Sequence, residues 1–249
     1  MFVKIIHLFS YTHCKMIRKS YRIFTIIVIL IAVIQVDKLY AQGVSKNTGL
    51  DDYLYNGKVY SYYPPNRVLG IQFLSKKAFS KATLWIKGAA YTDVNLNYDV
   101  LNQKLLLTYK TSIGAQQIIA LSLAYVDSFE FEHRFYIVER NTNDDPIIFQ
   151  YIKEGNSRIK IFWEKRLHLR SSASGSSEYE FSEPLRSIYL LHNQVFVLVS
   201  RRGQFKKVFP KREASLIIKY MKNHHWKLSK MTDAEFLSLL VYINQLRDE

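Results

Sequence analysis

Residues 94–109 read VNLNYDVLNQKLLLTY, and this pattern decides the class of fold. Val94, Leu96 and Tyr98 alternate with polar residues, and a polar break at Asn102-Gln103 separates them from a second apolar run. Alternation with a period of two places one side of a strand on a core and the other side in water. Because the break is short, we expect the two strands to form an antiparallel hairpin.

The same period-two pattern continues over about residues 68–199. Short polar breaks recur along it and predict hairpin turns between neighbouring strands. They lie at Gly88, Asn102-Gln103, Glu132-His133, Glu154-Gly155-Asn156 and His192-Asn193. We therefore predict a mainly β fold, an antiparallel meander of roughly ten strands that forms a sandwich or a curved open barrel. The serine-rich stretch from Arg170 to Pro184 is predicted to be a loop.

The C-terminal segment predicts a pair of helices. Pro210 begins a stretch with apolar residues at helical spacing that ends near Asn223. Thr232 and Glu235 then have the spacing of a capping box, in which hydroxyl and carboxylate accept from the first free amides of a helix. Helices of this length are marginal alone in water, so we expect both to pack on the sheet.

The N-terminal segment has the features of a secretory signal. Residues 23–36 carry no charge and follow Arg18, Lys19 and Arg22, as the apolar part of a signal peptide does. A membrane-spanning helix needs about 20 apolar residues, so an uncleaved anchor is the less favoured alternative. We predict cleavage after Ala41, with Met16 as an alternative start of translation.

These features divide the chain into four parts. Residues 1–41 are the predicted signal peptide, 42–66 a tyrosine-rich extension or edge strand, 67–200 the antiparallel β domain, and 201–249 a basic connector followed by the helical pair. Alternating tyrosines in the second part suit a strand face, with a sugar-stacking platform as the alternative. They are Tyr53, Tyr55, Tyr60, Tyr62 and Tyr63. The chain's one cysteine, Cys14, precedes the apolar run, so neither a disulfide in the mature chain nor a lipid-modified cysteine is expected.

The charge balance is basic. The chain has 249 residues, 48% of them hydrophobic, and a formal charge of +14, which excludes a disordered or collagen-like protein. Residues 42–249 keep 29 bases and 20 acids, a charge of +9. The densest basic stretch, interrupted by Phe205 and Phe209, consists of Arg201, Arg202, Lys206, Lys207, Lys211 and Arg212.

The predicted export limits the kinds of partner that the basic stretch of residues 201–212 can meet. Because nucleic acid is scarce outside the inner membrane, we expect an anionic lipid or lipopolysaccharide surface, or another envelope protein, rather than nucleic acid. The alternative is a solvated connector whose two phenylalanines pack inward. No transmembrane span is expected after cleavage of the signal.

Motifs that carry known chemistry are absent from the sequence. It contains no glycine-rich phosphate loop, no His-Glu-x-x-His zinc motif and no Gly-x-Ser-x-Gly nucleophile elbow. Five histidines follow residue 41, and we interpret them as structural because a metal site needs three or four converging ligands. They are His133, His168, His192, His224 and His225. The pairs Asp51-Asp52 and Asp144-Asp145 are interpreted as turn residues, with a calcium site as the less favoured alternative. No catalytic residue, cofactor site or metal site is therefore predicted.

Three stretches resemble a group of uncharacterised secreted proteins from Bacteroidota. Residues 39–42 (LYAQ) are similar to the end of signals common in that phylum. Residues 88–99, with 126–129 downstream, resemble the hairpin segment of the group, and residues 209–244 resemble its closing helical pair. The resemblance implies export and a β-rich architecture, and it carries no activity.

Three hypotheses of function remain open. The leading one is an exported envelope protein, periplasmic, associated with the outer membrane or secreted, that binds or supports structure without catalysis. The second is a periplasmic carrier that holds an acyl or lipid ligand between sheet and helices. The third is an enzyme whose residues converge only in the fold, with Asp93, Asp99, Glu164 and His168 as the first candidates.

Overall fold

The structure is a computed structural model that describes residues 51–111, 113–171 and 177–248. Strands make up 46% of these residues and helices 20%, which confirms the predicted mainly β class. The predicted signal peptide, the cleavage site and Met16 lie outside the described residues.

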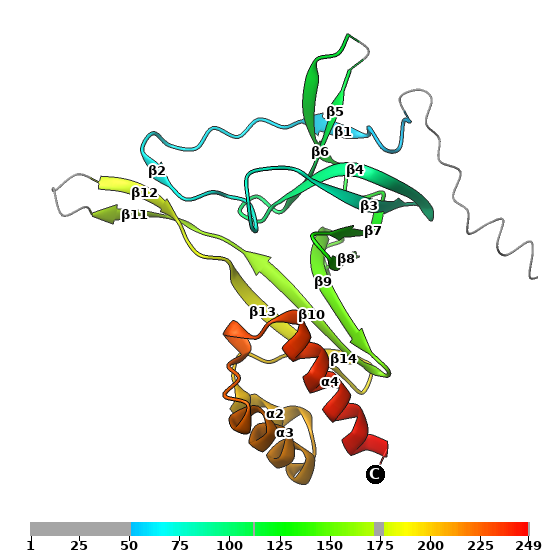
Figure 1. Cartoon of the computed structure of the whole chain (residues 1–249), viewed down its shortest axis with the longest axis vertical. Helices are drawn as coiled ribbons and strands as arrows, with labels where there is room; N and C mark the ends of the chain where they lie inside the picture. Colours follow the sequence, from blue (N-terminus) through cyan, green and yellow to red (C-terminus); the bar gives the residue numbers. More distant parts are fainter. Residues whose placement is uncertain (1–50, 112, 172–176, 249) are drawn as a thin grey trace, which may run out of the picture. The chain divides into compact units, whose positions relative to one another are not determined.

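The described residues form a large open sheet in which every pair of neighbouring strands is antiparallel (Figure 1). Its strand order is β1-β6-β5-β4-β3-β7-β8-β9-β10-β13-β14. Its strands are β1 (Gly57–Val59), β3 (Ser80–Ile86), β4 (Ala89–Asp99), β5 (Lys104–Lys110), β6 (Gln116–Leu121), β7 (Val126–Phe131), β8 (Arg134–Arg140), β9 (Pro146–Glu154), β10 (Ser157–Glu164), β13 (Leu185–His192) and β14 (Val195–Leu198). Two meanders, β3 to β6 and β7 to β10, are joined where β3 pairs with β7.

The predicted polar breaks are hairpin turns. Glu132 and His133, between β7 and β8, have φ of 50° and 61°, and Asn193 and Gln194, between β13 and β14, have φ of 48° and 64°. Positive φ at both central residues gives a two-residue turn whose twist matches the twist of the strands it joins. The meander is therefore formed by local turn chemistry, as the sequence pattern predicts.

The prediction of a loop from Arg170 to Pro184 is wrong for the residues near its two ends, which form strands. β11 (Leu167–Ser171) pairs with β12 (Ser177–Phe181), which pairs in parallel with β2 (Val68–Leu69), so the described residues also form a small sheet. Tyr179 and Phe181 alternate with glutamates, and this period-two pattern is hidden by the surrounding polar composition.

The tyrosine-rich segment also differs from the prediction. Tyr53 lies in a turn, because the Asp51 carboxylate accepts hydrogen bonds from the backbone N–H groups of Tyr53 (2.9 Å) and Leu54 (3.2 Å). The strand that follows this turn is β1, which pairs with β6 at one edge of the sheet and contains none of these tyrosines.

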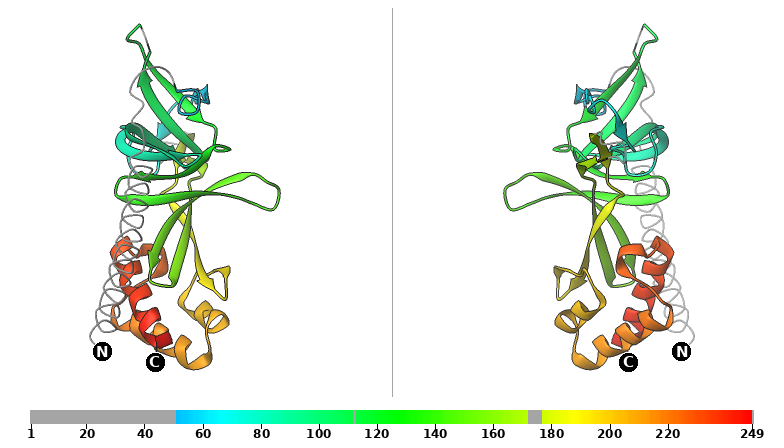
Figure 2. Two further views of the ribbon diagram at one scale, coloured as in Figure 1. Left: turned by 90° about the vertical axis from the view of Figure 1, so that its right-hand side faces the viewer. Right: turned by 90° about the vertical axis from the view of Figure 1, so that its left-hand side faces the viewer.

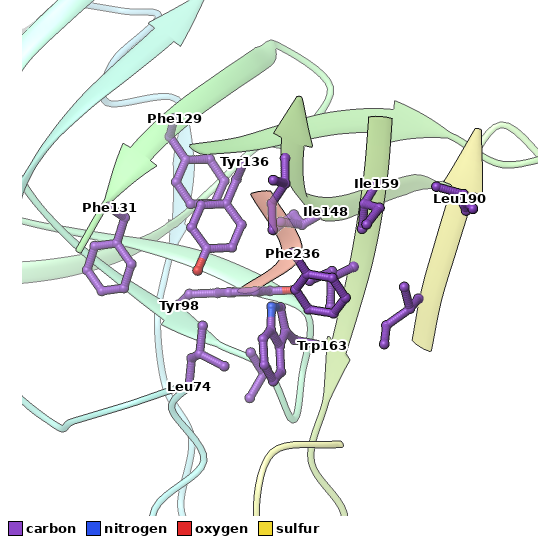
Figure 3. Packing of buried hydrophobic residues seen from close by; sticks show 14 of the residues in the cluster. Leu74, Tyr98, Phe129, Phe131, Tyr136, Ile148, Ile159, Trp163, Leu190 and Phe236 are labelled. Carbon is purple, nitrogen blue, oxygen red and sulfur yellow. The ribbon is translucent and has the colours of Figure 1, made fainter. Parts of the chain in front are cut away.

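An aromatic cluster fills the core where the sheet curves. The rings of Phe129 and Tyr136 stack with centroids 4.7 Å apart, and the ring of Tyr98, from β4, lies 6.0 Å from that of Tyr136 (Figure 3). All three side chains are fully buried. Strands distant in the sequence therefore share one core.

The C-terminal segment is helical, as predicted. It contains η1 (Arg202–Gln204), α2 (Phe205–Val208), α3 (Lys211–Asn223), η2 (Leu228–Lys230) and α4 (Asp233–Asp248). The capping box is present, since the Thr232 N–H donates to Glu235 Oε2 (2.7 Å) and the Glu235 N–H donates to Thr232 Oγ1 (3.2 Å).

The helical pair contacts the sheet through α4. This helix lies against β9 and β10 and buries Phe236, Leu240 and Ile243, while α3 packs against α2 and α4 (Figure 2). Among the described residues, none of the helices is long and apolar enough to span a bilayer.

Candidate functional site

The four residues suggested for an enzyme do not form one site. Asp99 is fully buried; its carboxylate accepts hydrogen bonds from the Tyr60 hydroxyl (2.6 Å) and from the backbone N–H of Asn102 (2.9 Å), which closes the turn after β4. Glu164 pairs with Arg166 at 2.8 Å. These two carboxylates therefore have structural partners.

His168 and Asp93 lie elsewhere again. His168 is exposed on β11 in the small sheet, 3.6 Å from a carboxylate oxygen of Glu180. Asp93 occupies a bulge of β4, where the register with β3 shifts and its φ is 59°. Of the four, Asp93 lines the larger of two cavities described for the chain, and the other three do not.

That larger cavity is a polar groove of about 730 Å³ over β3, β4 and β7. Its lining is Lys76, Ser80, Lys81, Ala82, Thr83, Thr92, Asp93, Glu130, Glu132 and His133. Glu132 accepts hydrogen bonds from Ser75 and Ser80 and pairs with Lys76 at 3.3 Å, so it holds the segment before β3 against the β7–β8 turn. Within the groove, Glu132 therefore has structural partners.

Metal binding finds no support in the described part of the chain. No group of three His, Cys, Asp or Glu side chains there is close enough to share an ion. Asp51 closes the turn before β1, and Asn141 accepts from the N–H groups of Asn143 and Asp145 (2.8 Å each) in the loop that contains the second aspartate pair. Both aspartate pairs, Asp51-Asp52 and Asp144-Asp145, therefore lie in turns.

His192 ends β13 and is partly buried. Its ring centroid lies 5.4 Å from that of Phe209, and its Nδ1 atom is buried without a hydrogen-bond partner in the described structure. The segment before α3 covers this end of β13, which the sequence pattern did not indicate. His133 is exposed in its hairpin turn.

The predicted basic stretch forms part of a larger surface. Phe205 and Phe209 are buried, 2% and 5% exposed, and their rings stack on each other, so they pack inward. The basic side chains between and around them are exposed, except Arg202, which is half-buried. The phenylalanines therefore anchor the stretch and the bases face water.

Helix α3 extends this surface. Its buried side is Ala214, Ile217 and Met221, whereas Lys219 and Lys222 are exposed together with Lys211 and Arg212. Eleven residues make three turns of helix, which brings Lys211 and Lys222 to the same side. We name the set of eight bases the basic face: Arg201, Arg202, Lys206, Lys207, Lys211, Arg212, Lys219 and Lys222.

The basic face was only partly predicted. Lys219 and Lys222 were missed because they lie outside the dense run, and the signal that finds them is the helical period. Residues 201–230 hold ten bases and one acid, Glu213, whereas the rest of residues 42–249 holds 19 of each. The excess charge of the predicted mature chain is therefore concentrated in this segment. No ion pair between described residues involves any member of the basic face.

The smaller cavity, about 280 Å³, lies at the connection between α3 and α4. An acyl carrier needs a cavity between the sheet and the helices. There, Phe236 and Leu240 of α4 are 0% exposed and Ile243 is 1% exposed. This side-chain packing gives the carrier hypothesis no support.

Comparison with known proteins identifies no relative: no family model, no curated protein and no solved structure matches the chain.

Proposed function

We propose that the protein is an exported cell-envelope protein that binds an anionic lipid surface through its basic face, without catalysis. The observation that carries the proposal is the concentration of charge, +9 within residues 201–230. The exposed lysines and arginines of α2 and α3 are free to face phosphate groups, because no described acid pairs with them. The predicted signal peptide supports the compartment.

The electrostatics are sufficient for reversible attachment. A Lys or Arg near an anionic membrane contributes about 1 kcal/mol. If half of the eight bases reach the headgroups, the gain is about 4 kcal/mol, or roughly a thousandfold in the binding constant. The attraction is screened within about 10 Å at 0.1 M salt and about 3 Å at 1 M, so attachment should be strongly salt-dependent.

Co-sedimentation with vesicles tests the proposal. The full chain is mixed with vesicles of phosphatidylcholine alone or with phosphatidylglycerol, at low and at high salt. Four bases of the basic face are reversed together in one variant: Lys207→Glu, Lys211→Glu, Lys219→Glu and Lys222→Glu. A matched control makes the same change in net charge at four exposed lysines of the β domain: Lys58→Glu, Lys104→Glu, Lys110→Glu and Lys153→Glu.

The comparison between variants isolates the basic face. The apolar run at 23–36 is present in every variant, so its own affinity for lipid cancels. We expect the salt-sensitive part of binding to phosphatidylglycerol to disappear in the first variant and to persist in the control. Equal loss in both variants shows that net charge alone matters and refutes the assignment to α2 and α3. Fractionation of the producing cells, with N-terminal sequencing of the envelope form, tests export and cleavage before Gln42.

A further inference from the structure

The cavity between α3 and α4 is rich in hydrogen-bond donors. It begins two residues after Lys222 of the basic face, and its lining is His224, His225, Trp226, Lys227, Lys230, Met231 and Glu235. Lysine ammonium and indole N–H groups donate and do not accept, and a neutral imidazole offers one donor and one acceptor. A donor-rich cavity of this kind suits a ligand with several acceptor oxygens.

The backbone of the cavity is fixed by the end of α3. The N–H of Trp226 donates to the carbonyl of Met221 (2.9 Å), and the N–H of His225 donates to the carbonyl of Lys222 (3.0 Å). This pair of bonds, with His225 at φ 57°, is the Schellman arrangement that closes a helix. The last carbonyls of α3 thus have partners within the chain.

Stacked rings hold one wall of the cavity. The His224 ring lies 4.7 Å from the Trp226 ring at an interplanar angle of 22°. Behind them, Tyr220 contacts both rings and stacks on Tyr242 of α4 at 4.1 Å and 9°. These contacts position the indole before any ligand arrives, which lowers the cost of ordering it on binding.

The sheet holds the other side of the connection. Arg186 of β13 donates from Nη1 to the carbonyl of Met231 and from Nη2 to the carbonyl of Leu228, each at 2.7 Å. Lys227 and Lys230, close to these two anchored residues in sequence, are therefore carried on a restrained segment. Restrained donors lose less conformational entropy when a ligand binds.

The acids near the cavity are engaged elsewhere. Glu235 accepts a hydrogen bond from the N–H of Thr232 as part of the capping box. Asp233, also in the first turn of α4, pairs with Arg134 at 3.0 Å. By contrast, Lys227 and Lys230 are exposed and have no ion pair among the described residues. The cavity therefore keeps two unpaired ammonium groups beside one engaged carboxylate.

We propose that this cavity binds a terminal phosphate group, as a phosphate monoester or as inorganic phosphate. The proposal rests on the proposed function, which it deepens by naming the headgroup chemistry that the anionic surface presents. Phosphate offers acceptor oxygens to charged donors, the arrangement in which hydrogen bonds are strongest. A volume of about 280 Å³ is near the lower end for small-molecule sites, so it suits a headgroup rather than a whole lipid.

Titration with soluble phosphate tests the cavity without a membrane. The full chain is titrated with inorganic phosphate and with glycerol phosphate at constant ionic strength, and the tryptophan emission is recorded. A Trp226→Phe variant shows which part of the signal comes from the cavity. The test variant is Lys227→Gln with Lys230→Gln, and its matched control is Lys104→Gln with Lys110→Gln, which removes the same charge from exposed lysines of the β domain. Thermal melts check that all variants fold.

We expect saturable binding that weakens at least about tenfold in the test variant and by less than about twofold in the control, since only the first pair lines the cavity. No saturable signal in the wild-type chain, or equal weakening in the two variants, overturns the proposal.

A vesicle arm separates this site from the basic face and identifies the source of the phosphate. Phosphatidic acid exposes a monoester, whereas phosphatidylglycerol exposes a diester. Preference for phosphatidic acid that is lost in the Lys227→Gln, Lys230→Gln variant supports a lipid headgroup as the ligand. Saturable binding of soluble phosphate without salt-sensitive vesicle binding supports the cavity with free phosphate as its ligand, and refutes the proposed membrane function. Salt-sensitive binding to phosphatidylglycerol without binding of soluble phosphate supports the proposed membrane function and refutes the phosphate site in the cavity.

Discussion

Replacing Arg186 by methionine removes the group that ties the α3–α4 connection to the sheet. The side chain lies between two rings, its Cζ atom 5.6 Å from the centroid of Trp163 and 5.3 Å from that of Phe236. Its two terminal nitrogens donate to the carbonyls of Leu228 and Met231. Burial lowers the pKa of Arg186, and Asp233 opposes that effect, so the guanidinium gives up solvation in order to make these contacts.

The loss of stability follows from these contacts. A hydrogen bond from a charged donor contributes about 1.5–3 kcal/mol, and the cation–π contacts add about 0.5–1 kcal/mol. Water can reach part of the connection, and methionine keeps some packing against the rings, so we expect a loss of about 3 kcal/mol. For a chain of this length the melting temperature should then fall by roughly 6–12 °C.

Denaturant unfolding, followed by tryptophan fluorescence and by thermal melting, measures this effect. The matched control is Arg166→Met, which breaks an exposed ion pair with Glu164 and should cost less than about 0.5 kcal/mol. Arg186→Lys keeps the charge but loses the planar fork, so it should recover less than half of the lost stability. If Arg186→Met is as stable as the Arg166→Met control, the connection is not held by this arginine and the reasoning is refuted.

Three further predictions concern stability. In Gly155→Ala the new Cβ lies 2.8 Å from Asn244 Nδ2 at a φ of 52°, and we expect the free energy of unfolding in denaturant to fall by about 1–2 kcal/mol. The control Gly88→Ala has a φ of 77° and nothing within 4 Å of its Cβ, so it measures the backbone strain alone. Equal losses of stability in the two variants show that the contact with Asn244 costs nothing. Burial and a neighbouring carboxylate raise the pKa of Tyr91 to about 12 from 10.0. The unfolded chain therefore releases this proton first, so stability is retained below pH 10 and falls between pH 10 and 12, and Tyr91→Phe should show a smaller fall in unfolding measured across that range. Asn97, 1% exposed, donates to the carbonyls of residues 76 and 77 at 3.1 Å. In the same assay, Asn97→Ala should lower the free energy of unfolding by about 2–3 kcal/mol, because these carbonyls lose their donor. An unchanged stability shows that water replaces the amide.

The local pattern was a good guide to strands, turns and helices. Alternation at Val94, Leu96 and Tyr98 predicted β4, and the breaks at Glu132-His133 and His192-Asn193 predicted hairpin turns. The structure places the second turn one residue later, at Asn193 and Gln194. These features depend on neighbouring residues only, because side-chain direction and turn dihedrals are properties of short segments. The β11–β12 pairing was missed, since glutamates and serines obscure the alternation that ends at Phe181.

Of the two candidate sites, the sequence indicates the basic face, whereas the cavity depends on the tertiary structure. The dense basic run is a property of the linear sequence, and helical phase adds Lys219 and Lys222 once α3 is known. The cavity beyond them combines a Schellman turn, a stacked Trp226 and the carbonyl contacts of Arg186 from β13. No pattern within residues 201–249 indicates that Arg186 contacts the α3–α4 connection. Arg186 lies some forty residues earlier in the sequence, and its position results from the pairing of β10 with β13.

Sequence alone was therefore enough to decide the mainly β class, the hairpin turns, the helical pair and the location of the excess charge. Each of these depends on the period of side chains along one segment, which short-range stereochemistry sets. Folding decided how β3 joins the two meanders, that the His192 ring packs against Phe209, that Asp99 closes a turn, and that one donor-rich cavity lies beside the basic face. These depend on contacts between residues distant in sequence, whose register is selected by the packing of the shared core around Tyr98 and Tyr136.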